Sequence, residues 1–183
     1  DYLEFRLRRY LTFAEFKSEL APHFGLGLEG YATWTSPIRK YSDMVNHRLI
    51  KAVLTQQACE KPKDEVLARL QEARRQNRLV ERDIADWLYC RYLADKVAEN
   101  VEFDAEVQDV MRGGLRVQLL ENGASMFVPA STLHPNKDEM QVNADELALY
   151  IQGERRYKIG DLVKVKLTEV REETRSIVGQ LII

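Results

Sequence analysis

The residue types best suited to chemistry are concentrated in one run near the start of the chain, residues 23–47. The run begins HFGL, continues after four further residues as YATWTSPIRKYSD, and has a histidine at position 47. Serine is a favoured N-cap and proline suits the first turn of a helix. Apolar residues then recur at helical spacing. We therefore expect a helix that begins at Ser36 and Pro37 and ends near Leu54.

Two cations at the start of this helix predict phosphate binding. Arg39 and Lys40 would lie in its first turn, where the helix dipole disfavours cations. The free backbone N–H groups there favour an anion, and the planar guanidinium of arginine can grip a phosphate with two hydrogen bonds. Tyr31 and Trp34 lie close by in the sequence and are suited to stacking on bases.

Ordinary packing is the alternative interpretation of each residue taken alone. Trp34 and Tyr41 would then be core residues. Asp43 and His47 would form an i,i+4 pair on the helix surface. At the level of single residues both interpretations stay open.

A second, longer helix is predicted from about Asp64 to Ala98, because this stretch contains no proline or glycine. Asn77 and Glu81 interrupt its apolar stripe and, being four residues apart, share one face. Either this face is a helix edge in contact with water, or the two polar groups point into a site. The apolar positions of the stripe are Val66, Leu70, Ala73, Val80, Ile84 and Leu88.

From about Val101 the hydrophobic period changes to two, which is typical of strands. We expect four or five short strands separated by turns, hence a small β-barrel, and a domain boundary near Asn100. The segment between Thr132 and Lys158 is interpreted as a long loop of this barrel. The predicted strands cover residues 103–107, 115–119, 126–128, 162–167 and 176–183.

The composition is that of an ordinary globular protein. Of the 183 residues, 45% are hydrophobic and 31% are charged, which excludes a mainly disordered chain, a collagen-like chain and a disulfide scaffold. No apolar run reaches the roughly 18 residues of a membrane-spanning helix, and the charged start does not resemble a signal peptide. With only two cysteines, Cys59 and Cys90, we expect a cytoplasmic protein with reduced, structural thiols.

The charge is distributed unevenly along the chain. Residues 1–99 carry a net charge of +2 and residues 100–183 a net charge of −4. This excludes a domain that binds nucleic acid through bulk charge, so any polyanion must bind at local clusters. The first residue is Asp1 rather than methionine, and we therefore expect the chain to be part of a longer protein.

The run at residues 23–47 resembles the signature of the ribonuclease II family, the processive 3′-to-5′ exoribonucleases. The resemblance extends over the whole chain. Residues 1–99 resemble the C-terminal part of the family's catalytic RNB domain, and residues 100–183 resemble its terminal S1-type OB-fold, most clearly at 157–165 and 170–177. The implied fold class is α+β, a helix-rich part followed by a five-stranded OB-fold barrel.

The resemblance also implies roles for single residues. Arg39 matches the family's catalytic arginine, which would stabilise the scissile phosphate in the transition state. Glu81 matches an acidic position that would orient a partner group, and Lys40 would contact a phosphate. Tyr31 and Trp34 would contact RNA.

The family cleaves RNA with magnesium held by a cluster of aspartates. No run of closely spaced aspartates occurs in this sequence, and Asp83 and Asp86 lack the further carboxylates that a magnesium site needs. The resemblance therefore implies magnesium as the cofactor, with its ligands upstream of this chain and no metal site within it. The chain by itself is predicted to be inactive.

The barrel sequence departs from the S1 pattern at its aromatic positions. The second strand reads GGLR at 113–116 where the family has FGAF, and Pro129 replaces a histidine. This departure favours contacts with the RNA backbone over base stacking, with a solvated strand face as the alternative. Alternation along the strand places Arg116 outward. The expected RNA-binding residues of the barrel are Arg112, Arg116, Phe127, Lys164, Lys166, Arg171 and Arg175.

The chain is therefore predicted to be part of a hydrolytic exoribonuclease that degrades single-stranded RNA to nucleoside 5′-monophosphates. We expect single-stranded RNA as its partner, no membrane association and a monomeric state. One alternative is a catalytically inactive RNA-binding module or truncated product. Another is an OB-fold used for protein interaction, which the acidic balance of residues 100–183 would suit.

Overall fold

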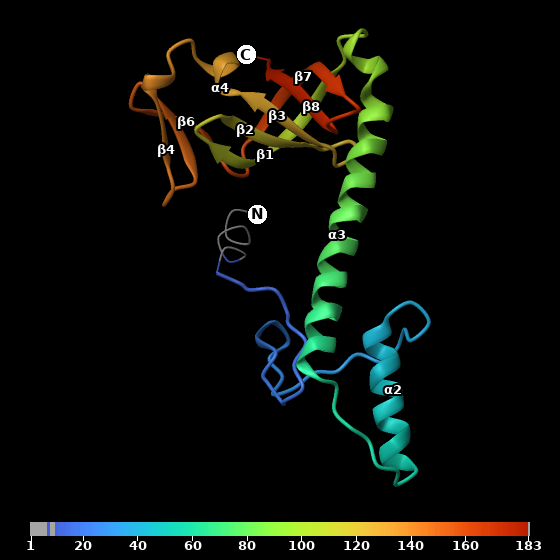
Figure 1. Ribbon diagram of the computed structural model, residues 1–183. Helices are drawn as coiled ribbons and strands as arrows, with labels where there is room; N and C mark the ends of the chain where they lie inside the picture. Colours follow the sequence, from blue (N-terminus) through green and yellow to red (C-terminus); the bar gives the residue numbers. More distant parts are fainter. Residues whose placement is uncertain (1–6, 8–9, 183) are drawn as a thin grey trace. The chain divides into compact units, whose positions relative to one another are not determined.

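Figure 1 shows the computed structural model, which describes residue 7 and residues 10–182. The chain divides into two compact units, one formed by Leu11–Val80 and the other containing Glu81 and the residues that follow it. Helix α3, Asp64–Leu93, contributes residues to both units. The two domains predicted to meet near Asn100 remain a prediction.

The unit of residues 11–80 is built from helices and extended chain. Its N-terminal segment contacts α3: Gln71 Nε2 donates to the Ala14 carbonyl oxygen at 3.3 Å, and the Arg78 guanidinium lies 4.7 Å from the centre of the Phe13 ring. Of the described side chains in this unit, only that of Asp43 is buried. The unit contains η1 (Phe24–Leu26), α2 (Tyr41–Leu54) and the first part of α3.

Helix α2 begins at Tyr41 with Lys40 as its N-cap, so the prediction that it starts at Ser36 and Pro37 is wrong. A turn precedes it, in which the amides of Arg39 and Lys40 donate to the Ser36 carbonyl oxygen at 3.3 and 2.9 Å. Lys40 has extended backbone angles, φ −122° and ψ 111°, and these separate the turn from the helix. The two cations therefore lie before the helix and not in its first turn.

The other ends of the two helices follow the predictions more closely. Helix α2 ends at Leu54, as predicted. Helix α3 ends at Leu93, short of the predicted Ala98, because the chain continues through a separate 3₁₀ turn, η2 (Asp95–Val97). Within the described part of the chain, no helix combines the length and the apolar character that crossing a membrane requires.

Five strands in the unit that contains Glu81 close into a barrel, in the order β1-β2-β3-β8-β7. This confirms the predicted α+β fold class with a five-stranded barrel of OB type. In β2, Leu115, Val117 and Leu119 are buried and Arg116 is exposed, as the period of two predicts. The strands are β1 (Glu102–Met111), β2 (Gly114–Leu119), β3 (Ser125–Pro129), β7 (Leu162–Arg171) and β8 (Ser176–Leu181).

The segment between Thr132 and Lys158 is not a loop, and that prediction is wrong. It forms a three-stranded antiparallel sheet in the order β4-β5-β6 (Figure 1). Leu149 and Ile151 of this sheet are buried. The sequence of β5, ALYI, is apolar throughout and that of β6, ERRYK, is mainly polar, so neither strand shows the period of two. The elements are α4 (Ala130–Leu133), η3 (Lys137–Glu139), β4 (Met140–Asn143), β5 (Ala148–Ile151) and β6 (Glu154–Lys158).

The last turns of α3 pack on the barrel. Cys90 and Leu93 are fully buried in the core that the barrel strands form. The Tyr89 hydroxyl donates to a carbonyl oxygen in the turn between β2 and β3 at 3.0 Å, and Asp83 forms a 3.4 Å ion pair with Arg175. Both cysteines of the chain are free thiols, and the buried one is structural, as expected.

Gly114→Ala is expected to lower the free energy of unfolding by about 3 kcal/mol. A Cβ at Gly114 would lie 2.0 Å from the Val128 carbonyl oxygen on the neighbouring strand, and its φ of 142° strains any other residue. The control is Gly113→Ala, whose Cβ would lie 3.7 Å from Phe127, an ordinary contact that costs less than about 1 kcal/mol. Urea unfolding followed by circular dichroism measures both variants, and equal midpoints would contradict this barrel register.

Candidate functional site

A buried carboxylate on α2 binds the segment that precedes the helix. Asp43 accepts a hydrogen bond from the Thr33 hydroxyl on Oδ1 at 2.6 Å and one from the Ser36 amide on Oδ2 at 2.9 Å. The Ser42 hydroxyl donates a longer one to Oδ1 at 3.3 Å. The bond from Thr33 is the largest cause that lowers the pKa of Asp43, although burial acts in the opposite direction. Asp43 is therefore ionised at neutral pH.

Two further side chains of α2 bind the same segment. Asn46 Nδ2 donates to the Thr33 carbonyl oxygen at 2.7 Å, and His47 Nε2 donates to the Trp34 carbonyl oxygen at 2.6 Å. They follow Asp43 by three and four residues and so share its face of the helix. The alternative in which Asp43 and His47 pair with each other is wrong, because Asp43 binds the Thr33 hydroxyl and the Ser36 amide and His47 binds the Trp34 carbonyl oxygen instead.

The held segment presents the predicted phosphate-binding and stacking residues to solvent. Arg39 and Lys40 are exposed in the turn, and the side chains of Tyr31 and Trp34 are 58% and 54% exposed. Tyr41 is 56% exposed as well, so the interpretation of Trp34 and Tyr41 as core residues does not hold within this chain. Polar side chains thus fix the segment from the helix side, and cations and aromatic rings remain accessible.

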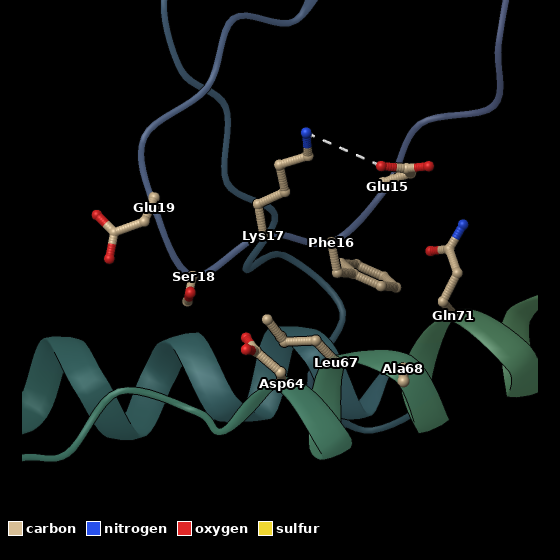
Figure 2. A pocket seen from close by; sticks show the side chains of 9 residues that line it. All are labelled: Glu15, Phe16, Lys17, Ser18, Glu19, Asp64, Leu67, Ala68 and Gln71. Carbon is tan, nitrogen blue, oxygen red and sulfur yellow. Dashed lines mark ion pairs between the residues drawn. The ribbon is translucent and has the colours of Figure 1, made fainter.

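A pocket in the same unit does not contain these residues. Figure 2 shows it between the segment 15–19 and the start of α3. Its volume is about 410 Å³. Three carboxylates, from Glu15, Glu19 and Asp64, and one cation, Lys17, line it, and Lys17 Nζ lies 3.9 Å from Glu15. This excess of negative charge disfavours a phosphate. We therefore do not place the site in this pocket.

Glu81, the other predicted catalytic residue, is exposed on α3. Its apolar neighbours on the predicted stripe are also exposed, with 53% for Val80, 52% for Ile84 and 54% for Leu88. Arg39 belongs to the unit of residues 11–80 and Glu81 to the other unit. A joint action of Glu81 and Arg39 therefore stays a prediction.

On the barrel, a cation and an aromatic ring lie on neighbouring strands. Arg116 on β2 is the Cα partner of Phe127 on β3, so the two side chains share the outer face. Arg116 is exposed and Phe127 is half-buried, and Arg112 is exposed in the turn that leads into β2. The face of the second and third strands and the adjoining loops are where OB-folds bind oligonucleotides.

Other predicted cations of the barrel are paired with carboxylates. Lys164 lies 3.4 Å from Asp104, Arg171 binds Glu169 with two hydrogen bonds of 2.6 and 2.8 Å, and Arg175 lies 3.4 Å from Asp83. Lys166 is the Cα partner of Glu102 across the β1–β7 pair. Among the described residues, Arg112, Arg116 and Lys166 have no ion-pair partner. The sequence could not reveal the pairs of Lys164 and Arg175, because their partners lie on β1 and on α3, whereas Glu169 lies two residues before Arg171 on the same strand.

Two family models match separate parts of the chain. Residues 1–56 match the RNB domain family, and residues 96–181 match the S1 RNA binding domain family. Exoribonuclease 2 of Haemophilus influenzae (strain 86-028NP) is 87% identical to this chain over 182 residues. The chain belongs to the ribonuclease II family. The resemblance seen in the signature at 23–47 is thereby confirmed.

The relatives in this family are much longer than the chain. The whole chain aligns with the Haemophilus protein, but it spans only 28% of that protein's length. Exoribonuclease 2 of Pasteurella multocida (strain Pm70) is 76% identical over 181 residues, with 99% of the chain and 28% of the relative covered. Mycoplasma genitalium RNase R in complex with ribose methylated single-stranded RNA is similar in fold, with a TM-score of 0.77, 23% identity, and coverage of 96% of this chain and 28% of that one.

The described residues do not fit the magnesium that the ribonuclease II family implies. Within residue 7 and residues 10–182, no three His, Cys, Asp or Glu side chains gather closely enough to hold a metal ion. Asp83 is paired with Arg175, and Asp43 uses its carboxylate oxygens for hydrogen bonds. No step of the chemistry is therefore derived through a metal at these residues.

Proposed function

We propose that this chain is part of a magnesium-dependent 3′-to-5′ exoribonuclease that hydrolyses single-stranded RNA to nucleoside 5′-monophosphates. The observation that carries the proposal is the turn before α2, which is fixed from one side by Asp43 and leaves Arg39 and Lys40 exposed. The names of the relatives, exoribonuclease 2 and RNase R, support the same activity. The proposal places the magnesium ligands outside this chain and the protein in the cytoplasm as a monomer.

Arg39 has the leading role in this proposal. A guanidinium with five donors in a fixed fork suits the charge that develops on a phosphate during hydrolysis. Lys40 would bind a phosphate as a point charge. Tyr31 and Trp34 would stack on bases, because their rings are exposed beside the cations. Glu81 would orient a partner group near the scissile bond.

The barrel would bind the RNA strand as it enters. Arg112, Arg116 and Phe127 form the proposed contact area, with phosphates at the two cations and a base on the half-buried ring. Lys166 on β7, which has no ion-pair partner among the described residues, is a further proposed phosphate contact. Exposed ion pairs contribute only about 0–1 kcal/mol, so a phosphate can still recruit the paired cations Lys164, Arg171 and Arg175.

The direct test uses the complete protein and RNA labelled at its 5′ end. With magnesium, we expect a ladder that shortens from the 3′ end, and with EDTA we expect none. A 3′-phosphate on the RNA should slow the reaction, because the terminal nucleotide must enter the site. Binding of RNA with no shortening under either condition would favour the inactive RNA-binding module, and no binding at all would favour a protein-interaction role.

Binding of single-stranded RNA by the chain should depend steeply on salt. Each phosphate contact contributes roughly 0.7 to the slope of log affinity against log salt. Arg112→Ala combined with Arg116→Ala is therefore expected to lower the slope by roughly 1.4. The matched control is Arg155→Ala, since that exposed arginine lies on β6 and has no role in the proposal, so the slope should not change. Fluorescence anisotropy over a salt series measures both, and an unchanged slope in the double variant would remove these arginines from the interface.

A further inference from the structure

The position of Asp43 is unusual for a carboxylate. It is the one charged side chain that is buried among the described residues, and it lies in a unit that buries no other described side chain. Taking a carboxylate out of water is costly unless hydrogen bonds compensate. Both oxygens of Asp43 are compensated, and the donors from outside the helix come from Thr33 and Ser36, at the two ends of one segment.

The hydrogen bonds continue from Asp43 to the cations. The Ser36 amide donates to Asp43, and the Ser36 carbonyl oxygen accepts from the amides of Arg39 and Lys40 at 3.3 and 2.9 Å. One residue therefore links the buried carboxylate to the backbone from which both cations project. If the carboxylate moves, the hydrogen bond from the Ser36 amide breaks, and the turn is no longer held in place on α2.

We propose that Asp43 is a positioning residue, which holds the turn of Arg39 and Lys40 in the geometry that binds the scissile phosphate. The inference rests on the proposed function and adds a residue to which the resemblance assigned no role. Asp43 does not touch the substrate in this proposal; it acts through Arg39. A displacement of about 1 Å in a catalytic group can lower a rate by about a hundredfold.

A purely structural role is the competing explanation. Asp43 lies in the first turn of α2, where a negative charge stabilises the helix through its dipole. Its oxygens, however, accept hydrogen bonds from Thr33 and Ser36, which lie outside the helix. The structural role predicts loss of stability alone, whereas the positioning role predicts loss of turnover that depends on Arg39.

Two variants break the contact and two serve as controls. In Asp43→Asn, an NH₂ group, which can only donate, replaces one carboxylate oxygen, so the bond from Ser36 or the bond from Thr33 is lost. Thr33→Val keeps the shape of the side chain but removes the hydroxyl. Thr33→Ser restores the hydroxyl and should restore the rate. Ser42→Ala removes the 3.3 Å bond to the same carboxylate from within the helix and should leave the rate unchanged.

The decisive experiment is a double-variant cycle in the complete protein. Asp43→Asn and Thr33→Val are each expected to lower kcat by about 10- to 100-fold with little change in KM. In an Arg39→Ala background the same changes should have almost no further effect, because residues that act as a unit are not additive. Equal effects with and without Arg39 would overturn the proposal. If Asp43→Asn does not fold, as judged by its melting temperature, Thr33→Val completes the cycle.

Failure of the proposed function is distinguishable in the same experiment. If the unaltered complete protein does not shorten RNA, the exoribonuclease assignment fails, and the cycle is then measured on RNA affinity in EDTA. Coupling between Thr33→Val and Arg39→Ala in affinity would still support Asp43 as the positioning residue. In that case, additive effects of the two variants on affinity, or an unchanged affinity of Arg39→Ala, would overturn it.

Discussion

Arg39→Ala in the complete protein is expected to lower the single-turnover rate of RNA cleavage by about a hundred- to a thousandfold. The guanidinium should interact most strongly with the charge that develops in the transition state, so RNA affinity should be largely kept. Arg39 is exposed in a fixed turn and has no ion-pair partner among the described residues, which leaves its fork free for a phosphate.

The matched control for this prediction is Arg48→Ala. Arg48 is also exposed and lies on α2, within the same unit, but the proposal gives it no role. Rapid-quench measurement of cleavage and anisotropy measurement of RNA binding separate the two steps. A near-normal single-turnover rate for Arg39→Ala would exclude the arginine from the transition state. An equal loss of rate with Arg48→Ala would mean that the overall positive charge matters and not the position of Arg39.

The second large effect concerns the chain in isolation, which is expected not to shorten RNA with or without magnesium. Magnesium is usually held by one or two carboxylates together with substrate phosphates in octahedral geometry. The candidate carboxylates are those of Glu29 and Asp43 in the signature and of Glu81, Asp83 and Asp86 on α3, and no three metal-binding side chains gather among the described residues. Arg39 alone can hold a phosphate but activates no water.

Purified chain, labelled single-stranded RNA and excess magnesium, analysed on a denaturing gel, test this prediction. The complete protein at the same concentration is the positive control. A mobility shift with the isolated chain shows that its barrel is folded and binds, so that inactivity is not caused by unfolding. Processive shortening by the chain alone would mean that its own residues complete the active site.

Features that depend on local periodicity were predicted well. The five barrel strands appear near the predicted residues, because one buried face imposes a period of two on the sequence. The outward position of Arg116 follows from the same rule. The sheet within residues 132–158 was missed, since β5 is apolar throughout and β6 is mainly polar, so that neither shows the period of two.

The start of α2 was predicted incorrectly for a different reason. Ser36 and Pro37 are good helix-starting residues by type, but type alone does not say where the Ser36 amide is bound. The Asp43 carboxylate binds it, and the helix begins only at Tyr41. The signal for this arrangement was present as the spacing of Asp43, Asn46 and His47 on one helix face, yet it did not indicate a target.

The sequence by itself determined which residue types stand in the signature, which strand positions face the barrel core, and the family to which the chain belongs. These properties depend on residue identity and on neighbours a few positions away. The tertiary structure decided which charged side chains form ion pairs and which segment of backbone is held by hydrogen bonds from a helix. Arg175 pairs with Asp83 across 92 positions and Asp43 binds Thr33 across ten, since such contacts depend on where the chain returns in space and leave no local pattern.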